Sequence, residues 1–182
     1  IDNFMYGNEA TLFHLVSHPK LNIIKGDCRN EALIKTEVGK ADVIVPLACL
    51  VGAPLCAQDP DSAKGINHDA IELILKHRGS QPILFPTTNS GYGVGEEGIH
   101  CTEESPLRPV SLYGKLKVDI ENTLLSAGNA ITLRLATVFG VSPRMRMDLL
   151  VNDFTYRAVK DRFVILFEAH FKRNYISVQD IG

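Results

Sequence analysis

A tyrosine and a lysine, preceded by a hydroxyl-rich segment, are the residues of this sequence best suited to chemistry. Tyr113 and Lys117 stand four residues apart, and Thr88 precedes Tyr113 by twenty-five residues. On a helix, positions i and i+4 share a face, so the phenol and the ammonium group can meet in one cleft. A neighbouring positive charge favours the phenolate and lowers the pKa of a tyrosine, which is ordinarily about 10. Tyr113 is therefore a candidate general base.

The surrounding segments bear on whether this pair is catalytic, because a tyrosine and a lysine at this spacing are also common on amphipathic helices. A helix predicted over residues 110–126 carries the pair in its first turns. Residues 81–86 form a short apolar run typical of a buried strand, which ends in Thr87 and Thr88. Ligands of parallel sheets lie beyond the carboxyl ends of the strands, so we expect Thr88 and Tyr113 to face one crevice.

Segments typical of strands and helices alternate along the chain. Short apolar runs predict strands at 21–25, 42–47, 81–86, around Ile131, at 163–167 and at 175–178. Apolar residues at helical spacing, with capping residues at the ends, predict helices over 8–18, 30–38, 62–78, 110–126 and 147–160. Alternating strands and helices imply parallel pairing with right-handed crossovers. The predicted fold is therefore α/β with a doubly wound parallel sheet of the Rossmann-like kind.

Seven short segments and one single asparagine occur in an order and at a spacing that match one enzyme family. Three of them are Thr87-Thr88-Asn89-Ser90-Gly91-Tyr92-Gly93, Tyr113-x-x-x-Lys117 and Arg134-Leu135-Ala136-Thr137-Val138-Phe139-Gly140. Further matches are Asp2-Asn3, residues 26–29, residues 42–49, Asn67 and residues 173–180. Together they resemble the extended short-chain dehydrogenase/reductases, in particular the NAD-dependent nucleotide-sugar epimerases and dehydratases. A lone Tyr-x-x-x-Lys is weak support, but ordered segments over essentially the whole chain are strong support.

Two features of that family are not found in these 182 residues. Family members begin with a strand and a glycine-rich turn that binds the cofactor pyrophosphate, and no Gly-x-x-Gly-x-x-Gly motif occurs here. A further helix and most of a sugar-binding lobe would follow Gly182. The resemblance therefore implies a single NAD-binding Rossmann-like domain over residues 1–182, truncated at both ends, with the substrate-binding lobe starting at about residue 141.

The resemblance also implies NAD as the cofactor and a role for individual residues. Tyr113 would take a proton from a sugar hydroxyl while a hydride leaves the same carbon, Thr88 would hydrogen-bond that oxygen, and Lys117 would also bind the nicotinamide ribose. The expected cofactor-binding residues are Asp2, Asn3, Asp27, Cys28, Leu47, Ala48, Asn67, Thr87, Tyr113, Lys117, Ala136 and Val138. The expected substrate-binding residues are Asn89, Ser90, Thr137 and Arg173, and a nucleotide-sugar is the expected substrate.

Ordinary structural roles stay open for these residues when the resemblance is set aside. Asp2 and Asp27 could be turn residues. Asn67 could cap a helix, and Leu47 and Ala48 could only fill the core. An Asp2 carboxylate bonded to both ribose hydroxyls would favour NAD over NADP, because it repels a 2'-phosphate.

Departures from the family pattern bear on the type of reaction. Sugar 4,6-dehydratases typically carry Asp-Glu directly after the threonine equivalent to Thr88, whereas this sequence has Asn89 and Ser90, so elimination of water is disfavoured. Thr137 replaces an asparagine of many sugar epimerases, and Arg173 matches an arginine that pairs with the nucleotide diphosphate. The leading prediction is an NAD-dependent epimerase of a nucleotide-linked sugar. The alternatives are a sugar or carbonyl dehydrogenase/reductase with net redox, and a non-catalytic nucleotide-binding protein.

Composition narrows the class of partners. A net charge of -2 provides no electrostatic footprint for nucleic acid or an anionic membrane, so we expect neither as a partner. The cysteines Cys28, Cys49, Cys56 and Cys101 form no Cys-x-x-Cys pair and no cluster with histidine, so we expect no metal and a reducing, cytoplasmic location. No run of 18 apolar residues occurs. The family resemblance implies a homodimer formed through the Tyr113 helix and the long helix before it.

Overall fold

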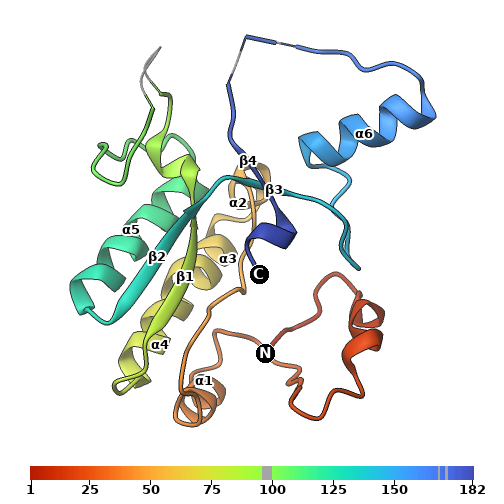
Figure 1. The fold of residues 1–182 in the computed structure, drawn as a ribbon. Coiled ribbons are helices and arrows are strands. Elements are labelled where there is room, and N and C mark those ends of the chain that lie inside the picture. Colours follow the sequence, from red (N-terminus) through yellow and green to blue (C-terminus); the bar gives the residue numbers. More distant parts are fainter. Residues whose placement is uncertain (96–99, 168, 171) are drawn as a thin grey trace. The chain divides into compact units, whose positions relative to one another are not determined.

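The chain divides into two compact units in the computed structural model, which describes residues 1–95, 100–167, 169–170 and 172–182. The first unit comprises residues 1–3 and 23–134, and the second comprises residues 4–22 and 135–182. Figure 1 shows their helices and strands. Each unit is described by itself below.

The sheet of the first unit is built around strand β1, Ile83–Thr88, which lies beside strand β2, Ala130–Leu135 (Figure 1). On its other side, β1 meets the segment 42–47 through a parallel bridge between Ile83 and Ile44. The Leu84 amide donates to the Ile44 carbonyl at 2.9 Å. Parallel pairing and helices between the strands confirm the predicted α/β fold.

Two predicted strands, 21–25 and 42–47, are not strands in the part of the chain that the structure describes. The segment 42–47 has an isolated bridge at Ile44, and the segment 21–25 has one at Lys25, which bridges Asp2 in parallel. The chain bends at residues 42–43, and Val43, Val45 and Leu47 are exposed, so 42–47 is not the buried strand that its apolar residues predict. An apolar run becomes a buried strand where neighbouring segments pack on it, which the run itself does not determine.

Several helical segments belong to the first unit. They are α1 (Glu31–Val38), α2 (Ala53–Gln58), α3 (Pro60–Lys64), the π-helical turn η2 (Gly65–Asp69), α4 (Ala70–His77), the 3-10 turn η3 (Asn89–Tyr92) and α5 (Leu112–Ala127). The Asn30 side chain accepts from the Leu33 amide and so begins α1, as predicted. The helix predicted over 62–78 is one helical stretch that η2 interrupts, and such turns are frequent at functional sites.

Apolar side chains of α1, α4 and α5 pack against β1 and the segment 42–47. The largest cluster of buried residues comprises Ile34, Val38, Ile44, Ile71, Ile74, Ile83, Phe85, Ile120 and Leu124. A second cluster comprises Leu50, Cys56, Ala63 and Ile66, with Tyr113 and Leu116 packed against it. These two clusters fix α5 against the sheet, and α5 carries the residues that the sequence singles out for chemistry.

The second unit holds a short parallel sheet of strands β3, Thr137–Phe139, and β4, Tyr175–Ser177. It also contains the 3-10 turns η1 (Glu9–Leu15) and η4 (Val178–Asp180) and helix α6 (Leu150–Lys160). The helix predicted over 8–18 is thus a shorter 3-10 turn. Buried Asn152 on α6 accepts from the Gly140 amide at 3.2 Å and donates to the Arg146 carbonyl at 2.9 Å.

The strand predicted at 163–167 is wrong. These residues have no regular structure, and Phe163 and Phe167 are 63% and 84% exposed. An apolar run forms a buried strand only where a neighbouring strand and a core pack against it, and among residues 1–95, 100–167, 169–170 and 172–182 the structure places neither around this run. Within the described ranges, no helix combines the length and the apolar character needed to cross a membrane.

Arg78 connects the end of α4 to the end of α5. Its guanidinium donates to the carbonyls of Gly128 at 2.6 Å, Asn129 at 3.1 Å and Ala127 at 3.3 Å. We expect Arg78→Met to lower the free energy of unfolding by about 1–3 kcal/mol, because these carbonyls lose a charged donor. Urea unfolding monitors this loss. Arg157→Met, which removes an exposed ion pair with Asp153, serves as the control, and an equal effect of both variants would contradict the assignment.

Candidate active site

Thr88 lies at the carboxyl end of β1, where the chain turns into η3. Its Oγ1 accepts from the Ser90 amide at 3.1 Å and donates to the Ser90 Oγ at 3.1 Å. Thr88 is therefore the N-cap of the turn, and its hydroxyl is held at the sheet edge where ligands of parallel sheets bind. Neighbouring Thr87 is buried, and its hydroxyl has no hydrogen-bond partner among the described residues. Asn89 is half-buried and Ser90 is exposed.

The turn that carries Thr88 packs closely on the first turn of the helix that carries Tyr113. A Cβ atom added to Gly114 would lie 3.3 Å from the Ser90 carbonyl oxygen, and one added to Gly91 would lie 3.0 Å from a methyl group of Val118. The Ser111 side chain begins α5 by accepting from the Gly114 amide at 3.1 Å. The turn that follows Thr88 thus lies against the helix that carries half-buried Tyr113.

Lys117 is buried under this edge, one helical turn beyond Tyr113. Its Nζ donates to the Pro86 carbonyl at 3.4 Å and lies 4.4 Å from the centroid of the Phe85 ring. Burial raises the pKa of the nearby Cys49 thiol, and the Lys117 ammonium acts in the opposite direction. The ammonium group of this α5 residue therefore lies near both β1 and Cys49.

Asn67, in the π-helical turn η2, hydrogen-bonds the backbone of Leu50, the residue after Cys49. Its Oδ1 accepts from the Leu50 amide at 2.8 Å, and its Nδ2 donates to the Leu50 carbonyl at 2.9 Å. Asn67 is 1% exposed, so these two bonds satisfy most of a buried amide. The direct effect of Asn67 is on the backbone next to Cys49.

An apolar cavity of about 220 Å³ lies in the first unit beside the segment 42–47. Its lining includes three residues with a predicted cofactor contact, Cys28, Leu47 and Ala48, together with Ile1. Burial raises the pKa of the Cys28 thiol, so the sulfur is neutral and suits an apolar surface. Small-molecule pockets usually measure about 300–1,000 Å³, so this cavity fits only part of a dinucleotide.

Asp2 forms a parallel bridge with Lys25, and Asp27 follows Lys25 by two residues. The Asp2 amide donates to the Ile24 carbonyl at 3.1 Å, and the Gly26 amide donates to the Asp2 carbonyl at 3.0 Å. Asp27 accepts from Arg29 through the backbone amide at 2.8 Å and through Nη2 at 2.6 Å. These bonds from Arg29 lower the pKa of Asp27 to about 2. Asn3 is exposed beside Asp2.

The remaining predicted residues belong to the second unit. Ala136 precedes β3, and Thr137 and Val138 pair with Tyr175 and Ile176 of β4. Exposed Arg173 lies two residues before Tyr175, the partner of Thr137. The parallel register therefore places Arg173 and Thr137 at the same end of the β3–β4 pair, a proximity that sequence separation alone does not reveal.

An ion pair between buried Glu121 and partly buried Arg134 is absent from the sequence-based predictions. Arg134 of β2 donates from Nε to Oε1 of Glu121 on α5 at 2.8 Å. The spacing of Tyr113, Lys117 and Glu121 at i, i+4 and i+8 places them along one side of a helix. That spacing could have identified Glu121, but not its partner on β2.

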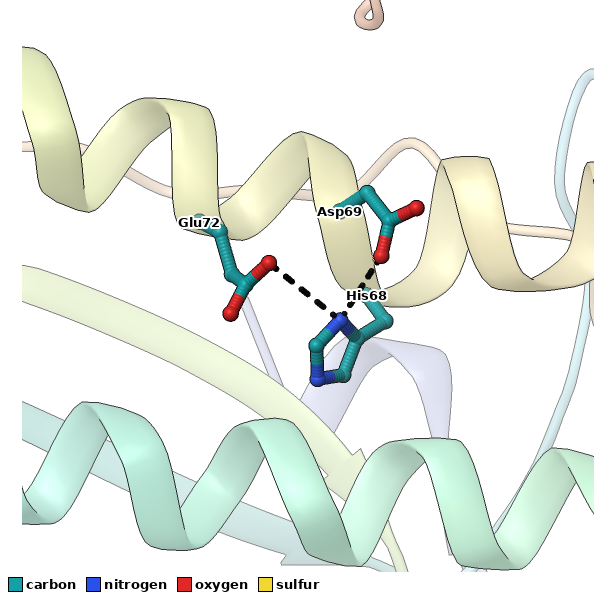
Figure 2. A group of neighbouring side chains, drawn as sticks. All are labelled: His68, Asp69 and Glu72. Atoms are coloured by element: carbon teal, nitrogen blue, oxygen red, sulfur yellow. Dashed lines mark hydrogen bonds and ion pairs between the residues drawn. The ribbon is translucent and has the colours of Figure 1, made fainter.

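A second group of titratable side chains lies between η2, α4 and α5. Figure 2 shows His68, whose Nδ1 is 2.9 Å from Asp69 Oδ1 and 3.7 Å from Glu72 Oε2. The other ring nitrogen is 3.2 Å from Asp119 Oδ2, and Lys64 binds Asp69 at 2.8 Å. The spacing would allow a metal ion. His68 and Asp69 already contact side chains of η2, α4 and α5, so we interpret the group as a link between helices.

The first unit is a Rossmann-like α/β unit, with Thr88 at the end of β1 and with Tyr113 and Lys117 on α5. The sequence profile of the NAD dependent epimerase/dehydratase family matches residues 4–182. The chain belongs to this family of NAD-dependent enzymes.

Solved structures show the same fold. UDP-glucose 4-epimerase from Thermotoga maritima superimposes with a TM-score of 0.77 at 20% identity, over 87% of this chain and 55% of the other. UDP-glucuronic acid 4-epimerase from Bacillus cereus gives 0.79 at 20% identity, over 93% and 56%. dTDP-glucose 4,6-dehydratase from Bacillus anthracis gives 0.77 at 20% identity, over 93% and 55%. The chain thus spans about half the length of these structures.

Gly93 ends η3 in a conformation that side chains rarely adopt, with a φ of 73°. An added Cβ would also lie 2.0 Å from the Arg108 carbonyl oxygen. Gly128 has a φ of 72° and open space around it. We expect Gly128→Ala to cost about 1–3 kcal/mol from backbone strain, and Gly93→Ala to cost about 1–3 kcal/mol more from the clash. Urea unfolding of both variants measures the difference, and equal losses would contradict the close contact.

The low pKa of Asp27 makes its stabilising effect depend on pH. Its pKa is about 2 in the folded protein against 3.8 ordinarily, so its contribution is fully present above the ordinary value and is lost as pH falls towards about 2. We expect Arg29→Met to return the Asp27 pKa towards its ordinary value. NMR titration of the Asp27 carboxyl carbon measures both values, and an unshifted pKa in the unmodified protein would refute the bond to Arg29.

Proposed function

We propose that the natural protein containing residues 1–182 is an NAD-dependent epimerase that acts on a nucleotide-linked sugar. The observation that carries this proposal is the close packing of the Thr88 turn on the first turn of α5 next to Tyr113. Two hydroxyl groups from different elements can then approach one substrate oxygen. A buried ammonium group, that of Lys117, lies on the same helix.

Tyr113 acts as the general base in this proposal. Its phenolate takes the proton of a sugar hydroxyl, and it returns the proton when the carbonyl is reduced again. Thr88 turns its one hydroxyl proton from Ser90 Oγ to the same oxygen, and Lys117 supplies positive charge that favours the phenolate. NAD, when bound, would supply the acceptor and then the donor of the hydride at that carbon, and hydride return to the opposite face of the carbonyl would invert the stereocentre without net redox.

The residues around the cavity of the first unit fit part of that cofactor. Small or apolar residues, Cys28, Leu47 and Ala48, leave room for a flat ring and present no charge to it. Asp2 lies at the adjacent bridge, where its carboxylate could accept from ribose hydroxyl groups. Asn67 supports the site indirectly by holding Leu50. Other proposed cofactor contacts are Asn3, Asp27, Thr87, Ala136 and Val138.

The substrate assignment rests on chemistry and on the named relatives. Arg173 has a planar fork of donors that suits a diphosphate, and its place beside Thr137 at one end of the β3–β4 pair lets both residues act on one ligand. Asn89 and Ser90 offer hydrogen bonds but no carboxylate for elimination of water, which favours epimerisation over dehydration. Two of the solved structures named above are epimerases of UDP-linked sugars.

Further proposals concern organisation and location. We propose that residues 1–182 form an NAD-binding domain whose substrate-binding lobe starts near residue 141. We also propose a cytoplasmic homodimer that associates through α4 and α5, with neither nucleic acid nor membrane as a partner. Sedimentation of the natural protein tests this, and a monomer at micromolar concentration would refute the dimer.

Tyr113→Phe removes the proposed base and changes little else. With NAD and a panel of UDP-glucose, UDP-glucuronic acid and UDP-N-acetylglucosamine, we expect the rate of 4-epimer formation to fall about 10²–10⁴-fold, while NAD affinity changes little. Proton NMR of the sugar identifies the product. Tyr156→Phe is a matched control, because Tyr156 and Lys160 repeat the same spacing on the exposed face of α6.

The outcomes separate the competing functions. Equal turnover of the unmodified protein and the Tyr113→Phe variant would refute the assignment of the base. Stoichiometric release of NADH would replace epimerisation by net oxidation. NAD binding without any reaction across the panel would favour a non-catalytic nucleotide-binding protein.

A further inference from the structure

The Glu121 carboxylate is buried and pairs with Arg134, whose side chain is 17% exposed, at a place where apolar residues would suffice for stability. Glu121 is 1% exposed, and Oε1 accepts from Arg134 Nε at 2.8 Å. Its other oxygen, Oε2, is buried without a hydrogen-bond partner among the described residues. Desolvation of two charges costs several kcal/mol per ion, and apolar pairs of similar volume are often at least as stable. Because Ile120 and Leu124 are already fully buried on α5, the need for a charged pair points to another role.

Arg134 extends this pair to the turn that follows Thr88. Its Nη1 donates to the Tyr92 hydroxyl at 3.1 Å and to the Glu103 carbonyl at 3.0 Å. Its guanidinium carbon also lies 5.2 Å from the centroid of the Tyr92 ring. Tyr92 is the last residue of η3, which begins directly after Thr88. One guanidinium on β2 therefore binds both α5 and the far end of the Thr88 turn.

We propose that Glu121, Arg134 and Tyr92 form a positioning network that sets the distance and angle between the Thr88 turn and the Tyr113 helix. The proposal rests on the proposed function. Glu121 lies two helical turns beyond Tyr113, so its bond to Arg134 restrains the rotation of α5 about its axis. Tyr92 restrains η3 from the opposite end to Thr88. A planar guanidinium with five donors can hold both restraints at fixed angles, which a lysine cannot do.

Such a network matters because the two hydroxyl groups come from separate elements. Proton and hydride transfer need both groups at one oxygen, and a misplacement of about 1 Å can cost about 10²-fold in rate. Apolar packing alone holds α5 near β1 but tolerates small shifts of one surface over another. The charged network adds directional bonds that packing does not supply.

Two variants separate positioning from stability in the natural protein containing residues 1–182. Tyr92→Phe keeps the ring and removes its hydroxyl group. Glu121→Leu combined with Arg134→Met replaces the charges by apolar groups of similar volume. With NAD and the sugar of the panel that reacts, we expect kcat to fall about 10-fold or more in each, while KM and NAD affinity stay within about threefold and the double variant unfolds at no lower urea concentration. The matched control is Asp153→Leu combined with Arg157→Met, an exposed pair with the same kind of bond at 2.9 Å.

A double-mutant cycle with Thr88→Ala distinguishes the mechanism. A positioning network acts through Thr88, so the loss in kcat caused by Tyr92→Phe should largely disappear in the Thr88→Ala background. Full additivity would overturn the proposal, as would an unchanged kcat in Tyr92→Phe. If the Glu121 and Arg134 double variant fails to fold, Tyr92→Phe and the cycle decide.

Amide hydrogen exchange provides a readout without catalysis. The Arg108 amide, bonded to the Gly91 carbonyl at 2.9 Å, and the Gly93 amide, bonded to the Ser90 carbonyl at 3.3 Å, should exchange faster in Tyr92→Phe. Amides in the middle of α5 should keep their protection. If the unmodified protein reacts with no sugar of the panel, the proposed function fails. Exchange then decides on the network alone, and unchanged rates at these two amides would overturn it.

Discussion

The candidate active site depends on the close contact between a turn and a helix that belong to different parts of the chain. The turn η3 lies against α5 because Gly91 and Gly114 present no Cβ atom at the contact. Gly93, directly after η3, lies so close to the Arg108 carbonyl oxygen that a Cβ atom would not fit between them. With a larger residue at Gly91 or Gly114, the neighbouring atoms would have to shift by a few tenths of an ångström. The close approach of the turn to the helix thus follows from contacts that glycine allows without such shifts.

Polar groups are buried around this contact at a cost that the fold must offset. Lys117, Glu121 and Asn67 are each at most 5% exposed. Buried charges and amides are tolerated where they are bonded, and here their partners are the backbone of Pro86 and Leu50 and the guanidinium of Arg134. These bonds connect α5, η2, β1 and β2. The apolar clusters supply the stability, and the polar groups define one arrangement of the elements.

Sequence and structure agree most closely where local chemistry decides the outcome. The ends of α1 and α5 follow from the capping residues Asn30 and Ser111, which bond the first free amides of each helix. The buried strand predicted at 42–47 is an isolated bridge at Ile44 preceded by a bend, and the apolar run 163–167 forms no strand. Pairing depends on a neighbour from elsewhere in the chain, which periodicity cannot reveal.

By itself, the sequence determined the α/β class, the family and the shared helical face of Tyr113 and Lys117, because these rest on local spacing and on the order of short segments. Only the tertiary structure decided which distant residues bond to each other. It placed Arg134 between Glu121 and Tyr92, bonded the Asn67 side chain to the backbone of Leu50, and paired β3 with β4. The physical reason is that hydrogen bonds and ion pairs act over a few ångströms in space. Their donors and acceptors are separated by up to some forty residues of chain, and only the packing of the core brings them together.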